Sequence, residues 1–196
     1  MRRQRPLRLR LHTVLRWLHI YTSMVSLLVV LFFAATGVTI NHPDWLAAER
    51  TDEFKGTLPA AWKTATGIDW LIVAEHVRAV NGVHGTVADR TQDDREAALT
   101  FRAPGYNAAT FINVQDGSYK LTVSYQGGIG VLNDLHRGRD AGSAWSWLID
   151  VSGVFLVFLS LTGLGLLFYL KKVRLKGMLT LIAGALIVVI LGTMAT

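Results

Sequence analysis

The sequence predicts an α-helical membrane protein with three transmembrane helices and a small α+β domain inserted between the first helix and the second. Three apolar runs predict the helices, because about 20 apolar residues are enough to cross a bilayer; they lie at residues 20–40, 147–170 and 177–196. The acidic residues predict the inserted domain, because all 14 of them lie between Asp44 and Asp150. The predicted segments are a basic N-terminus (1–19), helix 20–41, an outer domain (42–144), helix 145–170, a loop (171–176) and helix 177–196.

The basic residues predict the orientation. The first sixteen residues carry six arginines and no carboxylate, and four more basic residues lie between Lys171 and Lys176. Since cationic flanks of apolar helices stay in the cytoplasm, we expect the N-terminus and this loop inside and segment 42–144 outside, which is the periplasm if the membrane is a bacterial inner membrane. The formal charge of +6 is then a topology signal, and we expect the lipid bilayer, and no nucleic acid, as a partner.

A cleaved signal peptide is the alternative interpretation of the N-terminus. The apolar core of such a peptide has about 7–15 residues and precedes a small-residue cleavage site. The run here is longer and ends in Thr39-Ile40-Asn41-His42-Pro43. We therefore expect an uncleaved anchor.

The outer domain is expected to contain one helix followed by three or so antiparallel strands. Apolar spacing predicts a helix over residues 68–81, ended by Gly82. Weak alternation marks 97–101, and Asp116-Gly117 between the β-rich runs 110–114 and 119–125 predicts a hairpin. Residues 44–67 are expected to be a connector with a short helix near Trp45, and residues 127–130 (Gly-Gly-Ile-Gly) a flexible return to the membrane. The absence of cysteine excludes disulfides, iron–sulfur clusters and thiolate zinc sites.

The six histidines are the side chains of this chain best suited to bind a metal. They are His12, His19, His42, His76, His84 and His136. His12 and His19 are seven residues apart, so they share one helix face about 10 Å apart. His42 ends the first apolar helix and His136 precedes the second, so both are expected at the outer face. Imidazoles on neighbouring helices can hold haem between them. The alternative for each position alone is a histidine that satisfies a helix end or the interface. His76 and His84 are expected at the surface.

The two helix regions resemble those of the PepSY-associated transmembrane proteins. The first match is Leu15-Arg16-Trp17-Leu18-His19, followed by an apolar helix that ends in Ala35-Thr36-Gly37. The second is Leu135-His136-Arg137-Gly138-Arg139, then Trp145 and a helix that ends in Leu161-Thr162-Gly163-Leu164. The segment between them is similar in outline to the extracytoplasmic PepSY module. The chain would be a short, three-span variant, since larger members have four or more spans.

The resemblance implies an inner-membrane protein, and several members are haem-b reductases that pass electrons outward to ferric siderophores or other periplasmic acceptors. His19 and His136 correspond to the motif histidines of the family. The topology adds His42 as the partner of His136 and His12 as the one near His19; these four are the candidate axial ligands of one or two haems b. Either a second subunit, as in a homodimer, completes the inner site, or the chain binds a single haem. Electrons would come from the quinone pool or from a protein donor, since nothing resembles a dinucleotide site.

Three functions remain open at this point. The first is an electron carrier or ferric reductase, in which Arg137 and Arg139 pair with haem propionates, unless they are only a membrane-flanking basic pair. The second is a non-redox binding or assembly module anchored by the helices. The third is a histidine site for metal transport. Asp150 is either a proton relay, a counter-ion to these arginines or a solvated interfacial residue.

Overall fold

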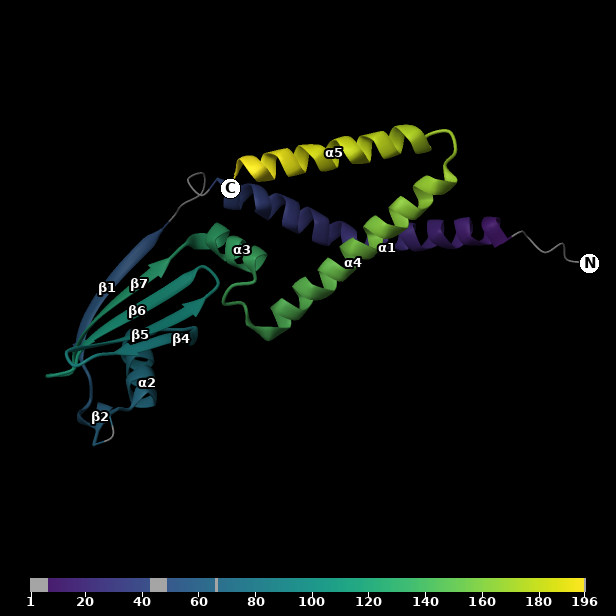
Figure 1. Cartoon of the computed structure of the whole chain (residues 1–196). Helices are drawn as coiled ribbons and strands as arrows, with labels where there is room; N and C mark the ends of the chain where they lie inside the picture. The colour runs from purple at the N-terminus through teal and green to yellow at the C-terminus, as the bar shows by residue number, and fades with distance from the viewer. Residues whose placement is uncertain (1–6, 43–48, 66, 196) are drawn as a thin grey trace, which may run out of the picture. The chain divides into compact units, whose positions relative to one another are not determined.

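The computed structural model describes residues 7–42, 49–65 and 67–195, which form two compact units. One unit runs from Phe32 to Ile149, and the other contains the residues before and after it. The helices of the chain are α1 (Leu7–Asn41), the 3-10 helix η2 (Ala60–Trp62), α2 (Trp70–Asn81), α3 (Gly127–Arg137), α4 (Gly142–Tyr169) and α5 (Arg174–Met194) (Figure 1). The strands are β1 (Arg50–Thr57), β2 (Lys63–Thr64), β3 (Gly67–Ile68), β4 (Thr86–Gln92), β5 (Glu96–Ala103), β6 (Tyr106–Asn113) and β7 (Ser118–Tyr125).

Three helices are long and apolar enough to cross a membrane within the residues that the structure describes, and they are α1, α4 and α5. This agrees with the three apolar helices predicted from the sequence. Helix α1 begins at Leu7, well before the apolar run, so the basic segment that carries His12 is helical as well. Most apolar side chains of these helices are exposed, which suits a lipid environment in which apolar groups face outward.

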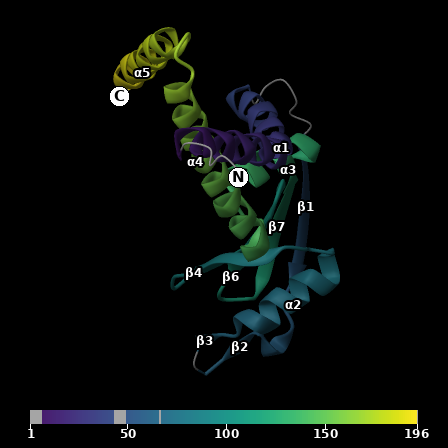
Figure 2. The same cartoon turned by 90° about the vertical axis from the view of Figure 1, so that its right-hand side faces the viewer.

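The inserted domain is built on a five-stranded antiparallel sheet with the order β1-β7-β6-β5-β4. The three inner strands alternate between buried and open positions, as a sheet with one covered face requires. Helix α2 lies against the covered face (Figures 1 and 2). The largest buried apolar side chains of this core include Phe101, Leu99, Ile112, Leu121 and Val73. The coarse prediction of a small α+β domain between the first two apolar helices is therefore confirmed.

The predicted helix 68–81 is present as α2, with caps at both ends. The Asp69 carboxylate accepts hydrogen bonds from the backbone N–H groups of Leu71 and Ile72, both at 3.1 Å, which is an N-cap. Gly82 ends the helix in the left-handed conformation at φ 66°, as glycine favours. The hairpin predicted around Asp116-Gly117 is also present, since β6 and β7 pair antiparallel on either side of it.

The predicted number of strands was too low. The outer strands β1 and β4 were missed, and β1 occupies part of the segment that we expected to be a connector. Both are edge strands with mainly exposed, charged or polar residues, so they lack the apolar alternation that reveals a strand. The short helix expected near Trp45 lies outside the described residues.

The expectation of a flexible segment at residues 127–130 was wrong, because these residues begin helix α3. Glycine disfavours helix by about 1 kcal/mol per residue, but contacts with the sheet hold this helix in place. The Asp134 carboxylate accepts the N–H of Gly105 at 2.8 Å, and the N–H of Gln126 donates to the Gly105 carbonyl at 2.9 Å. A Cβ at Gly105 would lie 2.6 Å from Val131, so the β5–β6 turn approaches α3 more closely than another residue would allow.

Candidate functional site

The structure pairs His19 with a threonine of another helix. His19 of α1 is partly buried, and its Nδ1 lies 3.1 Å from Oγ1 of Thr162 on α4. The Thr162 hydroxyl also donates to the carbonyl of Leu159, one turn earlier, at 2.9 Å. An ideal Cβ at Gly163 would lie only 3.1 Å from Cε1 of His19, so glycine is what lets the imidazole lie this close to α4.

The same arrangement occurs at His136, which lies in the last turn of α3. Its Nδ1 is 2.6 Å from Oγ1 of Thr36 on α1, and the Thr36 hydroxyl donates to the carbonyl of Phe32 at 2.6 Å. An ideal Cβ at Gly37 would be 3.6 Å from Cε1 of His136. Each histidine therefore contacts a Thr-Gly pair of another helix.

Aromatic and polar contacts hold His136 within the unit that contains the sheet. The ring of Phe33 meets that of His136 edge to face, with centroids 5.0 Å apart. The indole N–H of Trp145, near the start of α4, donates to the carbonyl of Leu135 at 2.8 Å. The Thr39 hydroxyl donates to the side-chain oxygen of Asn133 at 2.8 Å. Helix α3 is thus attached to the C-terminal part of α1 and the N-terminal part of α4, and Asp134 attaches it to the sheet.

The structure gives different surroundings to the remaining candidate ligands. The ring of His12 packs on that of Tyr169 with centroids 5.4 Å apart. His42 directly follows α1, and its backbone N–H donates to the Thr39 carbonyl at 3.2 Å. The pairing of His42 with His136, and of His12 with His19, stays a prediction.

The two candidate arginines follow His136 at the C-terminal end of α3, Arg137 as its last residue and Arg139 just beyond the Gly138 cap. Arg137 and Arg139 are both exposed, and neither forms an ion pair with a described carboxylate of the unit Phe32–Ile149. The backbone N–H of Arg139 donates to the carbonyl of Asp134 at 2.9 Å, which closes the end of the helix. Both guanidinium groups are therefore available to an anionic group, although solvent screens them.

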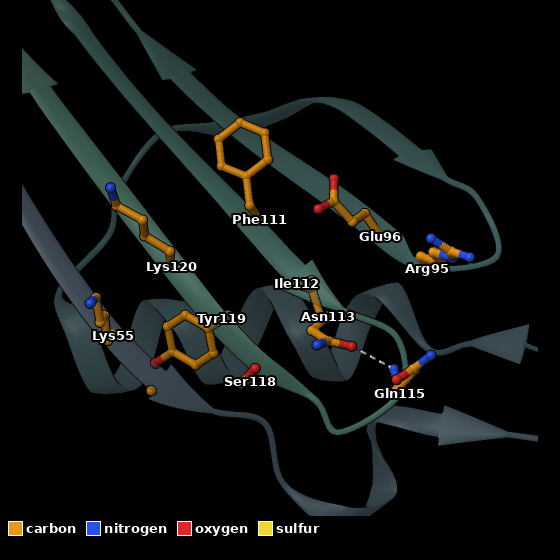
Figure 3. Close-up of a pocket in the computed structure, with 11 residues that line it drawn as sticks. Lys55, Arg95, Glu96, Phe111, Ile112, Asn113, Gln115, Ser118, Tyr119 and Lys120 are labelled. Atoms are coloured by element: carbon orange, nitrogen blue, oxygen red, sulfur yellow. Dashed lines mark hydrogen bonds between the residues drawn. The ribbon is translucent and has the colours of Figure 1, made fainter.

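A second feature is a hollow on the open face of the sheet, which Figure 3 shows in close-up. Its volume is about 530 Å³. The register places Lys55, Lys120 and Phe111 side by side on neighbouring strands, and Phe111 is 54% exposed. Arg95 and Glu96 complete the charged lining. Three cations against one carboxylate make this lining basic, although Lys120 also forms an ion pair with Glu53 at 2.8 Å.

Hydrogen bonds and burial shape the edges of this hollow. The backbone N–H groups of Glu96 and Arg95 donate hydrogen bonds to the Asp93 carboxylate, and these bonds hold the pKa of this carboxyl below its ordinary value. The same bonds anchor the loop that carries Arg95 and Glu96 of the hollow. Burial raises the pKa of the Tyr119 phenol, although its hydrogen bond to Asn81 acts in the opposite direction.

The hollow lies far from His136. Strand β7 runs from Ser118, which lines the hollow, to Tyr125, immediately before α3. Seven residues of strand span roughly 24 Å at about 3.4 Å each. The hollow and His136 are therefore separate candidate sites.

Comparison with known families agrees with the resemblance read from the two helix regions. Residues 13–195 match the PepSY_TM-like family. The chain belongs to this family. No curated protein and no solved structure matches it. The match covers both histidine–threonine pairs of this PepSY_TM-like chain, together with the inserted domain and all three apolar helices.

Sequence reasoning selected His19 and His136 but did not assign a role to Thr36 or Thr162. Both threonines stood in the motifs that carried the resemblance, each directly before a glycine. The signal that could have found them is repetition: a histidine, an apolar helix and a Thr-Gly pair occur twice in the same order. A helical pattern alone does not show which residues face each other across two helices.

Proposed function

We propose that this chain is an inner-membrane haem-b protein that carries electrons to a periplasmic acceptor, with reduction of a ferric chelate as the expected use. The observation that supports the proposal is the hydrogen bonding of the ring nitrogens of His19 and His136. Each makes a hydrogen bond through Nδ1, while Nε2 has no hydrogen-bond partner among the described residues. Metal-binding histidines generally have one nitrogen held by a neighbour and the other free for the metal.

The residues around these imidazoles fit an axial ligand of haem. A single histidine nitrogen is the usual haem ligand, and no cluster of three or more metal-binding side chains is found among the described residues, so an iron site here would depend on the porphyrin for its other ligands. Phe33 and Trp145 add apolar surface near His136. Haem would supply a reversible one-electron change at its iron.

The roles of the chain's own residues follow from these contacts. His136 and His19 would each provide one axial nitrogen, with His42 and His12 as the proposed second ligands on the outer and inner sides. A second copy of the chain is the alternative source of the second ligand. Arg137 and Arg139 would hold the propionates by charge-assisted hydrogen bonds. Glycines 37 and 163 leave room for the imidazole rings.

A non-redox binding module is the alternative function, and the basic hollow on the sheet favours it. Its exposed Phe111 and its excess of cations suit an anionic ligand or an acidic segment of a partner protein. Because the hollow lies far from His136, it supports binding without supporting electron transfer.

Absorption spectroscopy of the purified full-length protein separates these functions. We expect protein from haem-replete cells to be red, with a b-type reduced-minus-oxidised spectrum and one or two haems per chain by pyridine haemochrome. His136→Ala should lose half of this signal or more, according to whether the chain holds two haems or one. His84→Ala, which changes an exposed histidine of the domain, should keep it. A colourless preparation would refute the haem proposal and leave the binding module.

A further inference from the structure

The hydroxyl protons of Thr36 and Thr162 are already donated to backbone carbonyls. A hydroxyl has one proton to donate. The Thr36 hydroxyl lies 2.6 Å from the Phe32 carbonyl, and that of Thr162 lies 2.9 Å from the Leu159 carbonyl. A carbonyl oxygen has no proton, so the proton in each of these contacts belongs to the threonine.

The proton of the hydrogen bond between each hydroxyl and its imidazole must then come from the imidazole. Oγ1 of Thr36 lies 2.6 Å from Nδ1 of His136, and Oγ1 of Thr162 lies 3.1 Å from Nδ1 of His19. With its proton used, each hydroxyl can only accept, so Nδ1 of each histidine must carry the hydrogen. In a neutral imidazole, this leaves the lone pair on Nε2.

We propose that Thr36 and Thr162 are positioning residues that fix His136 and His19 in the Nδ1–H tautomer. Histidine free in water favours the other tautomer, with the proton on Nε2. The threonines would therefore impose a state in which Nε2 is ready to bind a metal without first losing a proton. The part that the two threonines play in haem binding rests on the proposed function. The assignment of the tautomers rests only on the hydrogen bonds of the two threonines.

Burial makes this control effective. Thr36 and Thr162 are each only 4% exposed. Water is therefore poorly able to replace either hydroxyl, and a hydrogen bond in surroundings of low dielectric is stronger than one in water. A partly buried Nδ1–H that lost this acceptor would instead be an unsatisfied donor, which is unfavourable.

Repetition supports the assignment independently. In one pair the histidine lies on α1 and the threonine on α4, and in the other the threonine lies on α1 and the histidine on α3. The hydroxyl donates to a carbonyl three or four residues earlier in both cases. The same proton arrangement thus arises twice from different segments of the chain.

Nitrogen NMR of histidine in the full-length, haem-free protein tests the proposal. At pH 8 an ordinary imidazole is neutral, and the ¹⁵N shifts then show which nitrogen carries the proton. We expect both His19 and His136 to be protonated at Nδ1. Thr36→Val should move His136 to the Nε2–H tautomer and leave His19 unchanged, and Thr162→Val should do the reverse. Thr36→Ser and Thr162→Ser, which keep the hydroxyl, should resemble the wild-type protein.

Haem titration of the same variants supplies a separate measurement. Each valine variant should bind haem roughly 10–100-fold more weakly at its own site, as loss of such a supporting contact usually does, and each serine variant should retain most of the affinity. An Nε2–H tautomer in the wild-type protein, or no change in the valine variants, would overturn the proposal. If the tautomers are as expected but no form binds haem, the proposed function fails while the assignment to the threonines stands.

Discussion

The glycines that follow the two paired threonines differ in how closely they approach an imidazole. An ideal Cβ at Gly163 would be 3.1 Å from Cε1 of His19, which is tighter than nine in ten real Cβ contacts, so the ring would have to move by a few tenths of an ångström. At Gly37 the corresponding distance to His136 is 3.6 Å, which is ordinary van der Waals contact. A single methyl group should therefore disturb one histidine and leave the other in place.

We expect Gly163→Ala to weaken the hydrogen bond between His19 and Thr162, and Gly37→Ala, as the matched control, to leave that of His136 intact. Stability is a poor measure of this effect, because alanine favours a helix over glycine by about 1 kcal/mol and a lost hydrogen bond costs a similar amount. Exchange of the imidazole N–H with water is a direct measure. It should become roughly fivefold faster for His19, as expected from about 1 kcal/mol. Equal exchange rates in both variants would show that the ring adapts without cost.

At the scale of secondary structure, the sequence could predict elements that carry their own local signals. Asp69 and Gly82 mark both ends of α2, and Asp116-Gly117 marks the β6–β7 turn. Two of the elements that were missed or misread, β1 and α3, depend on partners distant in sequence. Strand β1 is held by pairing with β7, although it carries few apolar residues. Helix α3 begins with glycines and is held by contacts with the β5–β6 turn, so its own residues indicate a loop.

Helix α3 should loosen when its side-chain hydrogen bond to the sheet is removed. Asp134→Ala leaves the Gly105 N–H without its acceptor, which costs roughly 1–3 kcal/mol. We expect faster hydrogen exchange in peptides covering 127–137, together with weaker protection of the Nδ1–H of His136. Asp94→Ala removes an exposed carboxylate elsewhere in the domain and should change neither. Unchanged exchange in the Asp134 variant would mean that other contacts suffice to hold α3.

At the scale of the whole molecule, the positions of the basic and acidic residues along the chain predict a membrane orientation, which the net charge alone does not. Sequence reasoning predicts which histidines share a membrane face, because charge and apolar length order the segments along the chain, and this grouping stays a prediction. It could not predict that His19 and His136 contact threonines, because that depends on which residues face each other when helices pack. The orientation itself is still a prediction, since it follows from the basic flanks alone.

Labelling of single cysteines can determine this orientation, and the absence of native cysteine removes any background. Gln115→Cys places a thiol in the exposed β6–β7 turn, and Lys172→Cys places one in the exposed segment between α4 and α5. If the basic segments stay in the cytoplasm, a membrane-impermeant maleimide should label the first variant in intact spheroplasts. It should label the second only after the membrane is opened. The reverse pattern would place the domain and His136 in the cytoplasm, where an outward path for electrons could not end, and would refute the proposed direction of transfer.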